Sequence, residues 1–271
     1  MQQMGCQPVL FIGSGLSRRY FGAPSWEELL SLLRAKCPLI EREYAYYKQT
    51  FKTPMAIGDE FARLYQQWAW DKGKNQFPAE LFKGDVPEQA YLKYAIAQHL
   101  KSITPHSLAG ITDLMVQAEI SAIRSMRPHA VITTNHDQFL ELLFPEYHPV
   151  IGQTIISSSQ ILYGEIFKIH GCVSDPSGIV FTQQDYEEFG IRKKYLSAKL
   201  LTYFSEHPLL FVGYSASDPN IRAILSDIDE AIPRPGPIGA IIPNIYILEW
   251  QNDMRVDYVP AREKLRSGLI D

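Results

Sequence analysis

Cysteine is scarce in this chain, and the few cysteines present follow no pattern. Cys6, Cys37 and Cys172 are far apart, and no two of them form a Cys-x-x-Cys pair. This spacing excludes a disulfide framework and a four-cysteine zinc ribbon, and we expect no metal site. An odd, unpatterned set of cysteines fits the reducing cytoplasm.

Long apolar runs and an excess of positive charge are also missing. No apolar segment approaches the roughly 20 residues that a membrane-spanning helix needs, and the first residues lack the layout of a signal peptide. Lys and Arg together number 26 against 30 Asp and Glu, which gives a formal net charge of −4. We therefore expect a soluble cytoplasmic protein with no membrane partner and no direct nucleic-acid binding.

Hydrophobic residues make up 46% of the 271 residues, and many of them gather in short runs. Each run ends next to a small, polar or charged residue; the runs are 9–12, 130–133, 166–169, 209–212 and 245–248. Such runs are typical of the buried strands of a parallel sheet. With helical patterns between them, they predict an α/β fold built on a Rossmann-like, doubly wound parallel sheet.

The first two predicted strands are separated by a long stretch of helical patterns, interrupted by several Pro and Gly residues. Because this stretch exceeds a simple crossover helix, it predicts an inserted helical subdomain at 36–126. Residues 1–35 and 127–271 then form the Rossmann-like core. A second helical stretch is expected at 183–206. Residues 250–271 look polar and helical, as a closing helix or as the start of a linker.

A glycine-rich turn, Gly-Ser-Gly-Leu-Ser at 13–17, follows the first strand and precedes a helix. Glycines let the backbone approach a pyrophosphate, and the amides at a helix N-terminus bind anions. The turn departs from the full Gly-x-Gly-x-x-Gly fingerprint because Arg18 stands where the third Gly would be. It predicts a dinucleotide-binding site, although any tight strand-to-helix turn can use two glycines.

Polar residues follow three further strands. In Thr-Thr-Asn-His-Asp at 133–137, Asn135 or Asp137 can cap the next helix, or Asn135 can orient a ribose or a water in the cleft. In Ile-His-Gly at 169–171, a neutral His170 can act as a general base near pH 7. In the turn at 213–219, Ser215 and Ser217 can bind phosphate or ribose, and Asp218 is expected to cap a helix.

The four turns, in this order, resemble the sirtuin-like family. The resemblance extends over residues 9–250 and is closest to the bacterial sirtuin-like domains of antiphage defence, which hydrolyse NAD. Two features favour that group over the protein deacylases. Deacylases carry a four-cysteine zinc ribbon, which this chain cannot build, and a long helical insertion is typical of the defence group.

This resemblance implies an NAD+ glycohydrolase that cleaves NAD to nicotinamide and ADP-ribose, with NAD as substrate and no metal. His170 matches the catalytic base, and Asn135 matches the residue that positions the nicotinamide ribose and the attacking water. Contacts to NAD are expected from the turns and from one acidic residue at the end of the last strand, namely Gly13, Ser14, Gly15, Ser17, Thr134, Asp137, Gly213, Ser215 and Glu249. His136 departs from the family pattern, in which an aromatic or aliphatic residue is commoner.

The resemblance also implies an effector that depletes NAD during infection and is controlled by oligomerisation or by a partner. We expect a homo-oligomer, and the candidate partners are a HerA-type ATPase, an Argonaute-like protein or a fused sensor module. Three alternatives remain open at this point. They are an NAD-dependent protein deacylase, a module that senses NAD or ADP-ribose without cleaving it, and a structural subunit of a larger complex.

Overall fold

The computed structural model describes residues 7–152, 164–214, 218–219, 221–223, 226 and 245–248. Within these residues, six parallel strands form one sheet in the order β3-β4-β2-β1-β5-β6. The strands are β1 (Val9–Ile12), β2 (Ala130–Thr133), β3 (His148–Ile151), β4 (Glu165–Lys168), β5 (Leu209–Val212) and β6 (Ile245–Leu248). The predicted Rossmann-like parallel sheet is confirmed.

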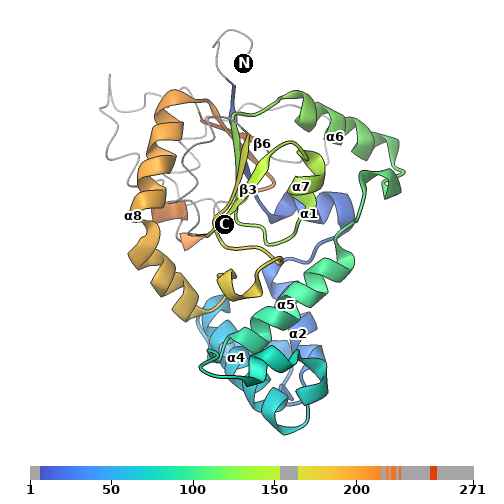
Figure 1. The fold of residues 1–271 in the computed structure, drawn as a ribbon, viewed down its shortest axis with the longest axis vertical. Coiled ribbons are helices and arrows are strands. Elements are labelled where there is room, and N and C mark those ends of the chain that lie inside the picture. Colours follow the sequence, from blue (N-terminus) through green and yellow to red (C-terminus); the bar gives the residue numbers. More distant parts are fainter. Residues whose placement is uncertain are drawn as a thin grey trace.

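Helices lie on both sides of this sheet and below it (Figure 1). They are α1 (Ser14–Phe21), α2 (Trp26–Lys36), α3 (Tyr44–Thr50), α4 (Pro54–Asp71), α5 (Ala90–Ile103), α6 (Leu114–Ser125), α7 (Phe139–Leu143) and α8 (Gln183–Glu206). Short 3-10 turns add η1 (Lys74–Gln76), η2 (Ala79–Phe82), η3 (Leu108–Gly110) and η5 (Pro176–Gly178). None of the helices in the described part of the chain is long and apolar enough to cross a membrane.

The two faces of the sheet are buried by different helices. Side chains alternate between the faces along a strand, so Val9 and Phe11 pack in the cluster that α8 joins. Leu10 and Ile12 pack in the cluster formed with α1, α6 and α7. Figure 1 shows α8 on one side of the sheet and α1, α6 and α7 on the other. Burial on both faces explains why β1 reads as a continuous apolar run.

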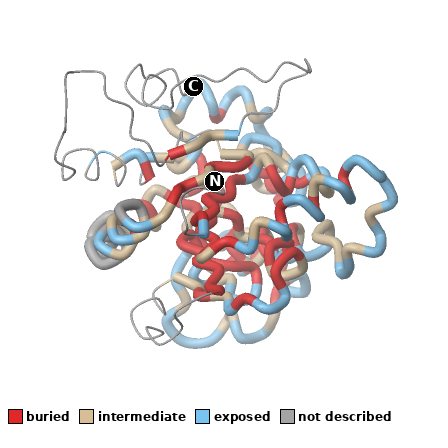
Figure 2. The backbone as a smooth tube through the Cα atoms, turned by 90° about the horizontal axis from the view of Figure 1, so that it is seen from above, coloured by how far each residue is buried: buried red, intermediate tan, exposed pale blue. Residues whose placement is uncertain are grey.

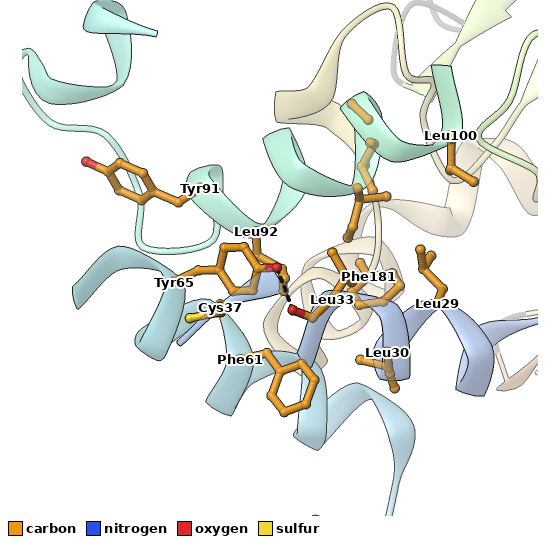
Figure 3. Close-up of a cluster of buried hydrophobic side chains, with 14 of the residues drawn as sticks. Leu29, Leu30, Leu33, Cys37, Phe61, Tyr65, Tyr91, Leu92, Leu100 and Phe181 are labelled. Atoms are coloured by element: carbon orange, nitrogen blue, oxygen red, sulfur yellow. Dashed lines mark hydrogen bonds between the residues drawn. The ribbon is translucent and has the colours of Figure 1, made fainter. Parts of the chain in front are cut away.

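Helices α2 to α5, with η1 and η2, form a helical module that has a core of its own. Its centre contains Phe61, Tyr65 and Leu92, which are fully buried. The Tyr65 hydroxyl donates a hydrogen bond of 2.7 Å to the Leu33 carbonyl oxygen (Figure 3). Phe181, from the segment between β4 and α8, enters the same core. This segment therefore joins the sheet to the helical module.

The helix starts follow the capping signals in the sequence. Ser25 and Glu28 form the predicted capping box at α2. A second box, Thr182 with Asp185, opens α8, which spans the predicted 183–206. The Asp218 carboxylate accepts a hydrogen bond from the Ile221 backbone N–H, as expected of a cap. Each box satisfies backbone donors that a helix N-terminus leaves without partners.

The helical module and the sheet layer divide the chain at positions that differ from the predicted boundaries at 36 and 126. The α2 side chains Leu29, Leu30 and Leu33 belong to the core of the helical module, although they precede residue 36. The α6 side chains Val116 and Ile120 pack on the sheet, although they fall within 36–126. The division at 36 and 126 stays a prediction. Viewed from above, the buried residues gather near the centre of the molecule, and exposed residues surround them (Figure 2).

Candidate active site

A cavity of about 450 Å³ opens where the carboxyl ends of the central strands meet the helical module. In the strand order, β1 lies between β2 and β5, and the connections after β1 and β5 lead to opposite halves of the sheet. Ligands of open α/β sheets bind at this kind of switch point. The sheet side of the cavity is lined by Ser14, Ser17, Thr134, Asn135, His136, Asp137, His170, Gly213, Tyr214 and Asp218. The opposite side includes Trp26, Leu29, Met55, Leu100, Phe181 and Tyr186.

The glycine turns after β1 and β5 pack directly on each other. The Gly15 backbone N–H donates a hydrogen bond of 2.8 Å to the Gly213 carbonyl oxygen. A Cβ at Gly13 would lie 2.4 Å from that same oxygen, and a Cβ at Gly213 would lie 2.4 Å from the Leu16 backbone nitrogen. Gly213 also has a φ of 61°. Close approach of two turns therefore explains these glycines before any ligand is considered.

Asn135 is held by hydrogen bonds from its side-chain amide. Nδ2 donates to the Gly13 carbonyl oxygen and to Ser17 Oγ, both at 3.0 Å. Ser17 Oγ in turn donates to Asp137 Oδ2 at 2.8 Å. Because both amide hydrogens point into the protein, Oδ1 is the polar atom of Asn135 left for a ligand. Ser17 and Asp137 thus support Asn135, and Asp137 Oδ1 also accepts from the Phe139 backbone N–H at the start of α7.

His170 follows β4 and is 1% exposed. Its Nδ1 lies 3.9 Å from Asp218 Oδ2, and its buried Nε2 has no hydrogen-bond partner among the described residues. The ring packs edge-on against Tyr186 and Phe189. Burial lowers the pKa of His170, whereas the charges of Asp218 and Asp185 act in the opposite direction. His170 is therefore neutral at pH 7, the state that a general base requires.

The glycine after His170 has a structural role. Gly171 has a φ of 85°, and a Cβ there would lie 2.2 Å from the Gly178 carbonyl oxygen. A side chain at this position would push away the segment that carries η5 and Phe181. Gly171 therefore permits the tight exit from β4 that keeps His170 at the cavity.

His136 belongs to the turn after β2, and Lys168, at the end of β4, contacts that turn. The buried Lys168 ammonium donates to the Asp137 carbonyl oxygen and pairs with Glu141 at 3.2 Å. Burial is the main cause that lowers the pKa of His136 to about 3, and the nearby His170, when it is protonated, and the Lys168 ammonium act in the same direction. His136 is therefore neutral as well, and its Nδ1 is buried without a partner among the described residues.

Buried polar atoms without a partner concentrate around this cavity. Seven such side-chain atoms occur in the described part of the chain. Four of them belong to residues that line the cavity: Trp26 Nε1, His136 Nδ1, His170 Nε2 and Tyr214 Oη. An unsatisfied buried polar group costs about 1–3 kcal/mol, so such groups are few in folded proteins. Their concentration at one cavity is what a site for a polar ligand requires.

The structure brings most of the predicted site residues together. Seven of them line the cavity: Ser14, Ser17, Thr134, Asn135, Asp137, His170 and Gly213. Gly13 and Gly15 lie behind that surface and shape the turn. Ser215 and Glu249 lie outside the described residues. No cluster of three or more His, Cys, Asp or Glu side chains suited to a metal occurs in the segments that the structure describes.

Several residues of the site do not follow from the sequence motifs. Trp26 comes from the helical module, and Phe181 and Tyr186 come from the segment after β4; no motif marks any of them. Asp218 was expected only as a helix cap, but its second carboxylate oxygen faces His170. The available signal was its position five residues after Gly213, in a turn that the sequence already assigned to the site.

Part of the chain is similar to a known protein family and to two curated proteins. Residues 129–259 match the model of the SIR2-like domain, which covers Asn135, His170 and Gly213. The NAD(+) hydrolase ThsA of Bacillus cereus (strain MSX-D12) is 31% identical over 119 residues, which is 39% of this chain and 23% of that protein. The NAD(+) hydrolase ThsA of Enterococcus faecium is 32% identical over 106 residues, which is 35% of this chain and 21% of that protein.

The matched segments thus span less than a quarter of the length of either relative. The family that these matches indicate is nevertheless the one that the ordered turns predict, and the fold is consistent with it. Residues 129–259 match a SIR2-like domain, and they contribute β2 to β6 of the Rossmann-like parallel sheet, in which β1 comes from residues before the match.

Proposed function

We propose that this protein is an NAD+ glycohydrolase, which cleaves NAD to nicotinamide and ADP-ribose. The observation that carries the proposal is the neutral, buried His170, whose unpartnered Nε2 belongs to the same cavity as the fixed amide of Asn135. The similarity to two proteins named NAD(+) hydrolase supports NAD as the substrate.

The cavity suits a dinucleotide in size and in position. Its volume of about 450 Å³ falls within the range of roughly 300–1,000 Å³ usual for small-molecule sites. The exposed Ser14 begins α1 at the cavity, where backbone amides and the positive end of the helix favour a pyrophosphate. The unpartnered Trp26 and Tyr214 donors offer further hydrogen bonds to ribose or carboxamide oxygens.

The reaction that we propose breaks the N-glycosidic bond between nicotinamide and ribose. Nicotinamide leaves readily because its ring nitrogen is cationic in NAD, and the ribose passes through a state that resembles an oxocarbenium ion. Asn135 Oδ1 accepts a hydrogen bond from the ribose or from the attacking water and so orients it. His170 Nε2 accepts the proton that the water loses as it attacks the anomeric carbon.

The first test compares NAD hydrolysis by the wild type with hydrolysis by His170→Ala and Asn135→Ala. Nicotinamide release is followed by chromatography, and circular dichroism checks the fold. We expect each variant to lose at least about 100-fold in turnover, because general-base catalysis alone contributes about 10²–10⁴-fold. His106→Ala is the matched control, since His106 is exposed and does not line the cavity.

The same assay distinguishes the alternatives. Robust NAD cleavage by both cavity variants would contradict the assignment of His170 and Asn135. NAD binding by the wild type without nicotinamide release, in the presence of any known activator, would indicate a sensing module. Nicotinamide release that requires an acetylated peptide would indicate a protein deacylase.

The biological setting that we propose follows from the resemblance to the defence group. The protein acts in the cytoplasm as an antiphage effector that depletes NAD, and oligomerisation or a partner controls it. The candidate partners are a HerA-type ATPase, an Argonaute-like protein or a fused sensor module. Mass measurement of the purified protein, alone and with each candidate, tests this proposal. A monomer that hydrolyses NAD fully without any partner would contradict it.

A further inference from the structure

The side chain of Asp218 lies beside three groups: a backbone N–H, a tyrosine hydroxyl and the ring of His170. Oδ1 accepts a hydrogen bond of 3.1 Å from the Ile221 backbone N–H, and Oδ2 accepts one of 2.8 Å from the Tyr186 hydroxyl. Oδ2 also lies 3.9 Å from His170 Nδ1. Each carboxylate oxygen therefore has a donor, and the carboxylate is held beside the imidazole ring rather than free to rotate.

Tyr186 is well placed to hold this carboxylate. It is 8% exposed, it lies one residue after the capping box of α8, and its ring touches the edge of the His170 ring. Burial and the neighbouring charge of Asp218 raise the pKa of the Tyr186 hydroxyl, so it stays protonated and can only donate to the carboxylate. Tyr186, Asp218 and His170 thus form a chain of contacts that ends at the cavity.

We propose that Asp218, held by Tyr186, is a positioning residue that keeps the Nδ1 hydrogen of His170 toward the carboxylate and leaves Nε2 unprotonated toward the cavity. Neither residue touches the reacting atoms. A carboxylate can accept a hydrogen bond but cannot donate one, so it selects the tautomer with hydrogen on Nδ1. At 3.9 Å the two groups are not hydrogen-bonded, so the proposal requires them to approach each other by about 1 Å. Contacts of catalytic groups often tighten in this way when substrate binds.

The substitution Asp218→Asn tests this tautomer directly. The Ile221 N–H requires an acceptor, so the amide oxygen keeps the cap and the amide NH₂ group faces Tyr186 and His170. His170 Nδ1 must then accept a hydrogen bond, which moves the ring hydrogen to Nε2 and removes the base. The variant keeps the size of the side chain and the helix cap, but it reverses the polarity of the contact.

The first readout does not depend on activity. Long-range ¹H–¹⁵N correlation spectra of protein labelled on histidine report which ring nitrogen carries the hydrogen, and the His170→Ala spectrum assigns the signals. We expect a protonated Nδ1 in the wild type and a protonated Nε2 in Asp218→Asn. The same tautomer in both proteins would overturn the proposal. Asp113→Asn is the control, because Asp113 caps α6 in the same way and lies away from the cavity.

The second readout is kinetic, and it rests on the proposed hydrolase function. We expect Asp218→Asn to lower kcat by about 10–100-fold, as is usual when a supporting hydrogen bond is lost, with a much smaller change in KM. Tyr186→Phe removes only the donor to the carboxylate and should lower kcat less. Tyr91→Phe, which loses a hydroxyl bonded to the Leu81 carbonyl oxygen, is its control.

The pH profile separates positioning from a general loss of structure. Asp218 and Asp185 on α8 raise the pKa of His170 against the effect of burial, and the other ionisable groups beside it are His136 after β2 and Tyr186. Losing the charge of Asp218 lowers the pKa of His170, so the acid limb of kcat/KM moves to lower pH in Asp218→Asn. Without the Tyr186 hydroxyl, the charge of the Asp218 carboxylate is less dispersed and stabilises protonated His170 more strongly. The pKa of His170 therefore rises, and the acid limb moves to higher pH in Tyr186→Phe.

Equal profiles in the wild type and both variants would contradict the positioning role. If neither the wild type nor the variants hydrolyse NAD, the proposed function is wrong. The histidine spectra still show which tautomer Asp218 selects, so the two proposals can fail separately.

Discussion

His136 lies between Asn135 and Asp137 in the turn after β2. Its side chain is buried, and Nδ1 has no hydrogen-bond partner among the described residues. Its pKa is lowered to about 3, from an ordinary value of 6.5, chiefly by burial. Between these two pH values the unfolded chain binds a proton that the folded chain does not. The free energy of unfolding therefore falls as the pH drops below 6.5, and the full contribution of His136 is present above it.

We predict that acidification from pH 7 to pH 5 lowers the free energy of unfolding, with His136 contributing on the order of 1 kcal/mol for each pH unit below 6.5. Urea unfolding at both pH values measures this change. His136→Asn should make the dependence shallower, because the titrating group is gone. His106→Asn, at an exposed position, should leave it unchanged, and an equal slope in all three proteins would contradict the assignment.

Single residues also show why the site was only partly predictable. Asn135 and His170 lie at strand ends in short motifs, so the sequence places them at one edge of a parallel sheet. Asp218 carries an equally clear signal, that of a helix cap, and it does cap. Its second contact, with Tyr186, joins positions 32 residues apart and depends on where α8 begins. No local pattern records such a contact.

The turns after β1 and β5 act as one structural element. Gly13 and Gly15 leave room for Gly213, and the positive φ of Gly213 turns the chain away after β5. The sequence predicted glycines that approach a phosphate. That role stays a prediction. The structure shows a second reason for the two glycines, because the space that a Cβ at either position would fill is occupied by the backbone of Gly213.

We predict that Gly213→Ala lowers the free energy of unfolding by more than about 2 kcal/mol, because backbone strain of about 1–2 kcal/mol adds to a contact of 2.4 Å. Gly22→Ala, with φ of 70° and nothing within 4 Å, should show the strain alone. Gly110→Ala, in open space and without positive φ, should change little. Thermal unfolding compares the three variants. Equal effects of Gly213→Ala and Gly22→Ala would show that the turns can separate at no cost.

The strands show which elements a sequence reveals. β1, β2, β5 and β6 begin and end at the predicted residues, and β4 begins one residue earlier than the predicted 166–169. β3 (His148–Ile151) was not predicted. It lies at the edge of the sheet, contains Pro149 and has one fully buried residue, Val150. His148 and Pro149 interrupt the apolar pattern of β3, which is buried at one position only, whereas β6 at the other edge keeps a continuous apolar run.

At the scale of the whole molecule, the helical module and the sheet are joined by an ion pair as well as by apolar packing. Lys93 on α5 contacts Asp185 on α8 at 2.5 Å, and their side chains are 9% and 11% exposed. Asp185 also accepts hydrogen bonds from the backbone N–H groups of Phe181 and Thr182. The pair therefore fixes the start of α8, and with it Tyr186, relative to the module.

We predict that Lys93→Met lowers the free energy of unfolding by roughly 2 kcal/mol. This is below the ~3–5 kcal/mol typical of breaking a buried pair, because Asp185 keeps its other donors. Lys48→Met is the matched control, since its pair with Glu27 is about half exposed and should contribute less than about 1 kcal/mol. Urea unfolding measures both, and similar losses would show that the buried pair does not join the two halves.

A helical unit was predicted at 36–126, but the part that α2 (Trp26–Lys36) plays in the helical module and in the site was not predicted. Amphipathic patterns and Pro breaks indicate that such a unit exists. They do not indicate which of its side chains faces the sheet. The rings of Trp26 and Phe181 stack with 4.5 Å between their centroids, and this contact closes one side of the cavity. It requires α2 and the segment after β4 to meet, which is a property of tertiary packing alone.

The residues that line the cavity are spread along the chain from Ser14 to Pro219. A chain still being synthesised has made α1 and the whole helical module long before the turn after β5 leaves the ribosome. Until that turn docks onto Gly13 and Gly15, the cleft lacks one wall and His170 lacks its carboxylate. Because the turn after β5 comes late in the chain, the cavity is completed only in the late stages of translation. For the NAD hydrolase that we propose, a fragment released from a ribosome that stalls early would therefore lack part of the active site.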